Sequence, residues 1–225
     1  MNYENILNKI EETLEGEAHL DELANEEQDP FKILISTILS ARTKDENTRK
    51  ATINLFAKYN TPKSIAEANI EDLEELIYNT GFYKVKAARI KEVSKIIEEK
   101  YDGVVPKDYE ELKSLPGVGP KTANCVLVYA FNEPAIPVDT HVHRVSNRLG
   151  WVKTKKPEET EKALKNLIPK ENWLQINRLF VTFGQEICLP INPKCDICPI
   201  NEFCPKDFSM EVAAKQKAKK KTSNR

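Results

Sequence analysis

The sequence lacks any apolar run that approaches the roughly 20 residues needed to span a membrane as a helix. Its first residues, Met1-Asn2-Tyr3-Glu4-Asn5, also lack the basic and apolar segments of a secretory signal peptide. The net charge of −1 by itself disfavours a nucleic-acid partner. With 40% hydrophobic and 31% charged residues, the composition is that of a globular protein, which we expect to be cytoplasmic and without a membrane partner.

The net charge is small, but the charged residues are unevenly distributed along the chain. Residues 1–30 carry ten acidic side chains against one basic side chain, Lys9, for a net charge of −9. Residues 205–225 carry seven basic side chains against two acidic ones, for a net charge of +5. Such polarity lets one surface face a polyanion while another repels it. The alternative is a solvated acidic helix and a frayed basic tail, and residues 212–225 are expected to be disordered.

Alternating patterns typical of β-strands are nearly absent, and the chain is predicted to be all-α with short connections. Asp29-Pro30 has the pattern of a helix start, while Ser64 and Asn69 are predicted caps of two shorter helices. Further helices are expected at about 44–59, 84–101, 108–115, 120–131, 139–150, 157–167 and 171–187.

Residues 115–119, Leu-Pro-Gly-Val-Gly, join two of these helices. Pro116 cannot continue the first helix, and Gly117 and Gly119 allow a tight turn with positive φ. Such a turn directs backbone N–H groups outward just before a new helix begins, which makes a site for one DNA phosphate. A plain helix–helix turn needs only one glycine. The second glycine, and Pro120 at the first helical position, favour the phosphate site.

Lys121 lies in the first turn of the helix that follows this hairpin. A cation is unfavourable at that end of the helix dipole, and partial desolvation adds to the effect. Both favour the neutral amine, which is the form that acts as a nucleophile. A surface lysine, or a second phosphate contact, accounts for the position equally well.

Asp139 lies in the segment Val138-Asp139-Thr140-His141 and is expected to cap the helix that starts there. A capping carboxylate is held ionised and points away from its helix. Facing a DNA sugar, it would stabilise positive charge that develops at the anomeric carbon. The spacing in sequence does not itself bring Lys121 and Asp139 together.

Four of the five cysteines lie within residues 188–204, in the spacing Cys188-x6-Cys195-x2-Cys198-x5-Cys204. A disulfide framework is not expected in a reducing compartment, so the spacing indicates a metal site. The spacing alone fits structural zinc and an iron–sulfur cluster equally. Cys125 lies alone on an apolar helix and is most simply a core residue.

These features, in this order, resemble the endonuclease III family of DNA glycosylases in the helix-hairpin-helix superfamily, over about residues 20–208. The resemblance rests on residues 115–123 and 138–141 and on the cysteine spacing. It implies two helical domains with a DNA-binding cleft between them. Residues 23–134 would form a six-helix barrel with the helix-hairpin-helix at about 108–131. Residues 1–22 and 135–211 would form the second domain, with a 4Fe-4S cluster on the four cysteines.

The resemblance also implies a base excision repair reaction on double-stranded DNA that contains damaged bases or abasic sites, performed by a monomer. The damaged base, an oxidised pyrimidine, is flipped out of the duplex. Lys121 then attacks C1′ and forms a Schiff base, while Asp139 stabilises the cationic sugar. β-Elimination finally nicks the strand 3′ to the lesion.

Further positions are candidate DNA contacts by the same resemblance. Phe82, in Gly-Phe-Tyr-Lys-Val-Lys-Ala at 81–87, matches a wedge that fills the gap beside the flipped base. Arg42 stands where the family usually has glutamine, in the loop that contacts the partner base. Lys84 and Lys86 are phosphate contacts or solvated lysines. The remaining candidates are Leu115, Gly117, Val118, Gly119, Thr122 and Lys194.

Two alternatives stay open from the sequence. The first keeps the fold but makes the substrate mismatched thymine or uracil opposite guanine. The second is a non-catalytic helix-hairpin-helix module that binds DNA and carries its cluster as a structural or redox element.

Overall fold

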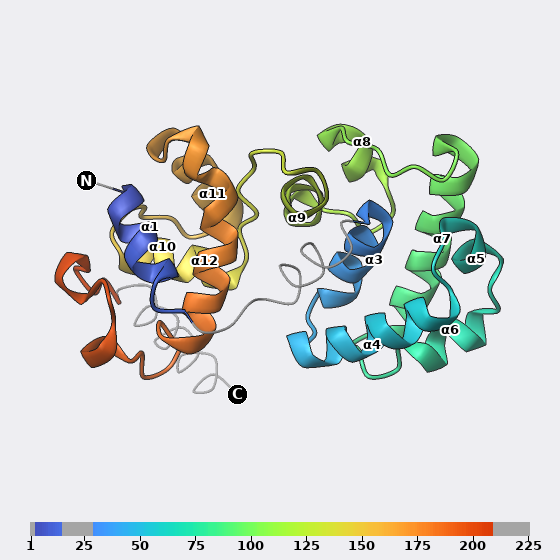
Figure 1. The fold of residues 1–225 in the computed structure, drawn as a ribbon, viewed down its shortest axis with the longest axis horizontal. Coiled ribbons are helices and arrows are strands. Elements are labelled where there is room, and N and C mark those ends of the chain that lie inside the picture. Colours follow the sequence, from blue (N-terminus) through green and yellow to red (C-terminus); the bar gives the residue numbers. More distant parts are fainter. Residues whose placement is uncertain (1–2, 15–28, 209–225) are drawn as a thin grey trace, which may run out of the picture. The chain divides into compact units, whose positions relative to one another are not determined.

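The computed structural model describes residues 3–14 and 29–208 (Figure 1). Within these ranges the chain has eleven α-helices, three short 3-10 helices and no strand, which confirms the predicted all-α fold. No helix among these residues combines the length and the apolar character that crossing a membrane requires. Residues 15–28 of the acidic segment 1–30 and the predicted disordered tail at 212–225 lie outside the described residues.

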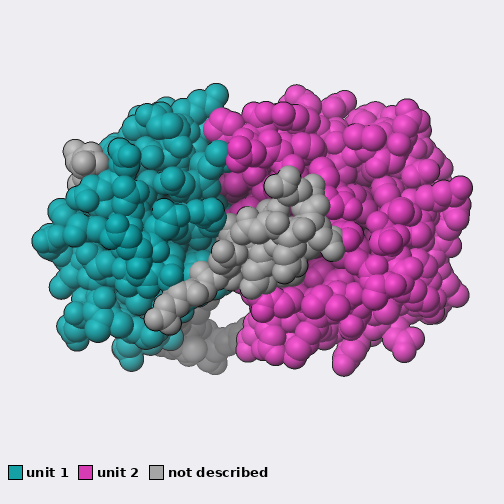
Figure 2. Space-filling view, in the orientation of Figure 1, with its two compact units in different colours: residues 1–16, 138–225 teal, residues 17–137 magenta. Residues whose placement is uncertain are grey.

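The described residues divide into two compact units (Figure 2). One comprises residues 29–137, and the other joins residues 3–14 to residues 138–208. The predicted boundary between residues 22 and 23 lies outside the described residues. The predicted domain ranges, 23–134 against 1–22 with 135–211, therefore stay a prediction.

The 29–137 unit is built around one buried helix, α3 (Pro30–Ser40). Eight of its residues are buried, because its apolar side chains occur on every face. It contacts α4, α7 and α9, which surround it in Figure 1. The other helices of this unit are α4 (Asp45–Lys58), α5 (Pro62–Glu67), α6 (Ile70–Leu76), α7 (Tyr83–Tyr101), α8 (Tyr109–Ser114) and α9 (Pro120–Phe131).

Side-chain caps fix where several helices begin. Asp29, Asn69 and Asp108 each accept backbone N–H bonds from the first turn of the following helix, as predicted for the first two. The prediction that Ser64 is a cap was wrong. Thr61 is the N-cap of α5, and Ser64 completes a capping box with it. The helix starts earlier than expected because Pro62 fits the first helical position.

The other unit is built around α12 (Trp173–Glu186), which contacts α1 (Tyr3–Glu11) and α10 (Thr140–Arg148). α1 buries Ile6, Leu7 and Ile10 on one face. α10 also contacts α11 (Pro157–Leu167). The helix expected at 171–187 is a 3-10 turn, η1 (Lys170–Asn172), followed by α12. Two further turns, η2 (Cys195–Ile197) and η3 (Asn201–Phe203), lie within the cysteine segment.

Candidate active site and cysteine cluster

The hairpin between α8 and α9 is held from its inner side. The side chains of Leu115 and Val118 are buried in the core of the 29–137 unit, with exposed fractions of 2% and 6%. The N–H of Val118 donates to the carbonyl of Leu115 over 3.1 Å. The side chains of these two candidate DNA contacts therefore face the core, and the N–H of Val118 is used within the turn.

The two glycines of the hairpin have different reasons to be glycine. Gly117 has a φ of +76°, the left-handed conformation that a tight turn requires. Gly119 is extended instead, so the expected positive φ was wrong for this residue. A Cβ atom built on Gly119 would meet no heavy atom within 4 Å. The backbone at Gly119 therefore faces open space, at the N-terminus of α9.

Lys121 is the second residue of α9 and is half-buried. Four residues that follow it, Ala123, Asn124, Cys125 and Val126, are buried. The lysine thus stands at the outer end of a helix whose body lies in the core, next to the open backbone of Gly119. Thr122, also half-buried, shares this first turn. Cys125 is buried and takes part in no disulfide among the described residues, as expected of a core residue.

Asp139 is the N-cap of α10, as predicted. Its Oδ1 atom accepts the N–H groups of His141 and Val142, each over 2.8 Å. Among the described residues, no hydrogen bond reaches its second carboxylate oxygen, Oδ2. The bonds to Oδ1 therefore fix the Asp139 side chain at the start of α10. Lys121 belongs to the 29–137 unit and Asp139 to the other.

Arg42 and Phe82 are both exposed, and both adopt left-handed backbone conformations with φ of +54° and +59°. Phe82 has an exposed fraction of 65%. Lys86 is 3% exposed and donates hydrogen bonds to Leu39 O and Thr43 Oγ1. It is neither a phosphate contact nor a solvated lysine, which were the two possibilities considered from the sequence. Lys84 and Lys194 are exposed.

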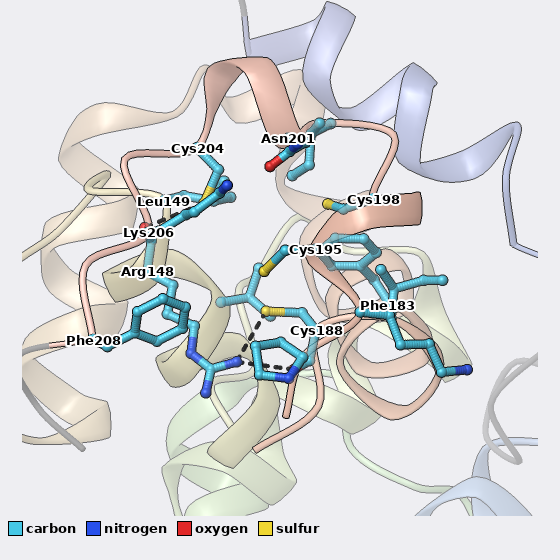
Figure 3. A pocket seen from close by; sticks show the side chains of 15 residues that line it. Arg148, Leu149, Phe183, Cys188, Cys195, Cys198, Asn201, Cys204, Lys206 and Phe208 are labelled. Atoms are coloured by element: carbon cyan, nitrogen blue, oxygen red, sulfur yellow. Dashed lines mark hydrogen bonds between the residues drawn. The ribbon is translucent and has the colours of Figure 1, made fainter. Parts of the chain in front are cut away.

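The four clustered cysteines are free thiols that line one pocket (Figure 3). Apolar side chains, among them Val145, Leu149 and Phe183, form much of the remaining wall. Burial raises the pKa of the Cys198 and Cys204 thiols. Binding of a metal group replaces such thiol protons.

Two arginines of α10 hold Cys188. The buried Arg148 donates from Nη1 to Cys188 Sγ over 3.3 Å and to Leu189 O over 2.7 Å. One turn earlier, Arg144 donates from Nε and Nη2 to Cys188 O over 3.1 and 3.0 Å. Figure 3 shows the Arg148 guanidinium beside the Cys188 sulfur. A buried cation beside a sulfur atom suits an anionic thiolate ligand.

The four thiols suit a metal group that thiolates hold. In the described ranges, no three or more His, Cys, Asp or Glu side chains are placed to hold a single metal ion. The thiols line an apolar pocket with a guanidinium at one of them, and four cysteines of this kind fit an iron–sulfur cluster.

The roles of Arg144 and Arg148 and the burial of Lys86 were not predicted from the sequence. The sequence nevertheless contains a spacing that indicates each of them. The two arginines are four residues apart on one helix and therefore share a face. Lys86 lies four residues before Ile90 and eleven before Ile97, in register with the buried stripe of α7.

Two models of known protein families match different segments of the chain. The model of the HhH-GPD superfamily of base excision DNA repair proteins matches residues 35–170. The model of the iron–sulfur binding domain of endonuclease III matches residues 188–204. The chain therefore carries an iron–sulfur binding domain.

Endonuclease III of Thermotoga maritima is 57% identical over 180 residues, which are 80% of this chain and 84% of that protein. A solved structure described as a trapped endonuclease III–DNA covalent intermediate has a TM-score of 0.77 and 37% identity, covering 92% of this chain and 97% of that chain. A thermostable thymine-DNA glycosylase also has a TM-score of 0.77, at 26% identity, covering 90% and 93%. The chain thus belongs to the endonuclease III family, bifunctional DNA glycosylases and abasic-site lyases of base excision repair.

Proposed function

We propose that this enzyme removes oxidised pyrimidines from double-stranded DNA, with Lys121 as the nucleophile and Asp139 as the carboxylate that stabilises the cationic sugar. It acts as a monomer where the chromosomal DNA lies. The observation that carries the proposal is the position of Lys121, half-buried two residues after the open backbone of Gly119. A phosphate bound at that backbone brings the neighbouring sugar towards the amine.

The first stage breaks the bond between base and sugar. With the damaged base flipped out of the stack, the lone pair of Lys121 Nζ attacks C1′. The glycosidic bond breaks, and the base leaves with the bonding electrons and takes up a proton. Oδ2 of Asp139, the carboxylate oxygen without a hydrogen bond from the described residues, faces the positive charge that develops on the sugar. The nitrogen then loses a proton, and its lone pair forms the C=N bond of an iminium as the C1′–O4′ bond breaks. O4′ takes up a proton and the sugar ring is open.

The second stage cuts the strand. The iminium acidifies the C2′ hydrogen, which leaves as a proton. Its electrons form a C2′–C3′ double bond as the C3′–O bond breaks, and the 3′ phosphate departs. Water then hydrolyses the iminium and releases the free amine of Lys121. The same lysine therefore accounts for both the glycosylase and the lyase activity.

Most of the proposed DNA contacts belong to the 29–137 unit. The backbone at Gly117 and Gly119 and the side chain of Thr122 bind phosphate, while Leu115 and Val118 shape the hairpin from the core side. Phe82 fills the gap that the flipped base leaves, and Arg42 contacts the partner base. Exposed Lys194, in the other unit, adds a phosphate contact.

We further propose that Cys188, Cys195, Cys198 and Cys204 are the four ligands of a 4Fe-4S cluster, and that residues 1–22 and 135–211 form the domain that carries it. When bound, the cluster would cross-link the four cysteines through iron–thiolate bonds and so stiffen the loops at 188–204. It takes no part in bond cleavage. A purified protein that contains zinc and has no absorbance near ~400 nm would contradict this assignment.

Borohydride reduction of the iminium tests the role of Lys121. Incubation with an abasic or thymine-glycol duplex and borohydride should give a covalent protein–DNA adduct for the native enzyme. Lys121→Ala should give none, because no amine is left to form the iminium. Lys113→Ala, which removes a half-buried lysine from the preceding helix, should still be trapped. Trapping of Lys121→Ala at the native level would refute the assignment.

Removal of mismatched thymine or uracil is the second candidate function. The similarity to a thymine-DNA glycosylase favours it, together with Arg42 at the position where the resemblance leads us to expect glutamine. Single-turnover rates on thymine-glycol and on guanine–thymine duplexes distinguish the two substrates. We expect the thymine-glycol duplex to be cut faster.

A further inference from the structure

Two loops that are far apart in the sequence meet in the 29–137 unit. Residues 41–44 follow α3 and contain Arg42, while residues 77–82 precede α7 and contain Phe82. A Cβ atom on Gly81 would come within 2.9 Å of the Arg42 carbonyl oxygen, which is backbone and cannot move aside cheaply. The two loops therefore touch through their main chains, and only glycine fits at position 81.

Hydrogen bonds of Lys86 and Thr43 connect these two loops to each other and to α3. Lys86 Nζ donates to Leu39 O over 2.7 Å and to Thr43 Oγ1 over 2.6 Å. The N–H of Gly81 also donates to Thr43 Oγ1, over 3.2 Å, and that hydroxyl donates to Ala41 O over 3.4 Å. One hydroxyl thus uses its donor and both acceptor positions, and it ties each loop to α7.

The ammonium of Lys86 suits its place at the end of α3. Leu39 belongs to the last turn of that helix, where carbonyl groups lack helical partners and the helix dipole is negative. Burial, with a smaller contribution from the charge of Arg89, lowers the pKa of Lys86 to about 8. A lysine is rarely buried unless its hydrogen bonds fix something, because desolvation of its charge opposes folding.

The two loops that this network connects each contain one exposed residue with a strained backbone, Arg42 or Phe82. Arg42 and Phe82 both have positive φ, which is unfavourable for any residue with a Cβ and persists only where the surroundings impose it. Both residues are exposed to solvent, Phe82 with an exposed fraction of 65%. The strain lies on the two loops that Lys86 and Thr43 connect.

We propose that Lys86 is a positioning residue that, through Thr43, locks the Arg42 loop and the Phe82 loop together so that both side chains enter the DNA duplex as one rigid element. This inference rests on the proposed function, in which Arg42 and Phe82 contact the gap left by a flipped base. Lys86 itself does not touch DNA. Its effect is on insertion, and phosphate binding by the hairpin at 115–119 does not depend on it.

The test uses a duplex with 2-aminopurine opposite a tetrahydrofuran abasic analogue, whose fluorescence rises when the base loses its stacking. The native enzyme should raise the signal, and Phe82→Ala and Arg42→Ala should raise it less. Lys86→Met, which keeps the aliphatic stem, and Thr43→Val, which keeps the shape, should each lower the signal to the level of Phe82→Ala. Both should lower the single-turnover excision rate about ten-fold, as expected when a charged hydrogen bond is lost.

Three comparisons separate positioning from general structural damage. Thr43→Ser, which restores the hydroxyl, should restore the signal. Lys95→Met, on an exposed position of the same helix, should behave like the native enzyme. Binding to undamaged duplex should stay within two-fold of native in Lys86→Met, since the hairpin is unchanged. Adding Phe82→Ala to Lys86→Met should lower the signal no further, because both act through one element.

The outcomes distinguish this inference from the proposed function. If the native enzyme forms no borohydride adduct with an abasic duplex, the proposed function fails. If it forms the adduct but Thr43→Val gives the native fluorescence, the positioning role is refuted. The Thr43→Val and Thr43→Ser pair decides the question even if Lys86→Met does not fold. Equal losses in the fluorescence signal and in undamaged-duplex binding would also refute it.

Discussion

At the scale of single residues, the hairpin shows how two glycines serve different ends. Gly117 is needed by the chain itself, since its φ of +76° is unfavourable for any other residue. Gly119 has an extended backbone and open space where a side chain would be. Nothing in the described structure requires glycine there. Glycine at this position leaves the backbone open to the close approach of a ligand.

Alanine at each glycine should separate folding from binding. Gly117→Ala should lower the free energy of unfolding by about 1–2 kcal/mol, the cost of a left-handed L-residue. Gly119→Ala should change it by less than about 0.5 kcal/mol, yet weaken binding to an abasic-analogue duplex about ten-fold. Urea unfolding and a fluorescence binding titration measure the two quantities. Native affinity in Gly119→Ala would show that DNA does not approach that backbone.

Lys86 makes stability depend on pH in an unusual direction. Its folded-state pKa of about 8 lies below the ordinary value of 10.5. Between these values the unfolded chain holds the proton and the folded chain does not, so this lysine makes folding more favourable as the pH rises. Below pH 8 the ammonium is charged in both states, and its burial opposes folding.

The free energy of unfolding of the native protein minus that of Lys86→Met should therefore increase with pH. Between pH 7.5 and 9.5 we expect an increase of about 1–2 kcal/mol, from 1.36 kcal/mol per pKa unit. Urea unfolding at several pH values gives this difference directly, and Lys95→Met serves as the control. A difference that is constant or decreasing over this range would show that Lys86 titrates normally.

At the scale of elements, α10 carries residues that belong to two sites of its unit, the proposed catalytic site and the cysteine cluster. Asp139 caps its N-terminus, while Arg144 and Arg148 further along hold the backbone and sulfur of Cys188. Close packing against α12 helps to fix it, since Arg144 Nη2 donates to Gly184 O over 2.8 Å. A Cβ on Gly184 would come within 2.9 Å of that same nitrogen. One helix thus positions the proposed catalytic carboxylate and a proposed cluster ligand.

Substitutions at Asp139 should distinguish its two roles. Asparagine caps helices as well as aspartate, so Asp139→Asn should leave the free energy of unfolding within about 0.5 kcal/mol of native. Asp139→Ala loses the bonds to His141 and Val142 and should be less stable by about 1 kcal/mol. Base excision should fall on the order of 100-fold in both, because each loses the negative charge. Native excision by Asp139→Asn would refute the electrostatic role.

Helix limits were predictable where one local signal decides them. α9 and α11 begin and end at the predicted residues, since a proline at the first helical position marks each start. The prediction for Ser64 was wrong because Ser64 and Thr61 are both good capping residues, and the sequence does not show which of them is the N-cap. Caps depend on neighbours within one turn, so most of them can be predicted from the sequence.

The burial of Lys86 was not predicted for a physical reason. Its position in the stripe of α7 indicated the core, but charged side chains are seldom buried without partners. Its partner Leu39 lies 47 residues away in the sequence. Such pairings depend on how whole helices pack, as does the contact of Arg148 with Cys188 across 40 residues. The cysteine spacing, in contrast, was visible because the ligands are close in sequence.

At the scale of the whole molecule, the two units have separate cores and different sources of stability. The 29–137 unit has a large apolar core around α3. In the other unit, the four thiols, Arg148 and several apolar side chains line a pocket that a cluster would fill. Both tryptophans of the chain, Trp151 and Trp173, belong to this second unit. Tryptophan fluorescence therefore reports on the cluster-binding unit alone.

Removal of the cluster with an oxidant and a chelator should destabilise only that unit. Without it, the four cysteines are no longer cross-linked, and the free energy of cluster binding no longer contributes to the folding of this unit. We expect urea unfolding followed by tryptophan fluorescence to shift to lower denaturant. Circular dichroism should retain a second transition at its original position, from the helices of the 29–137 unit. Cys125→Ala, a thiol outside the pocket, should keep the cluster and its absorbance. A common shift of both probes after removal would mean that the two units unfold as one.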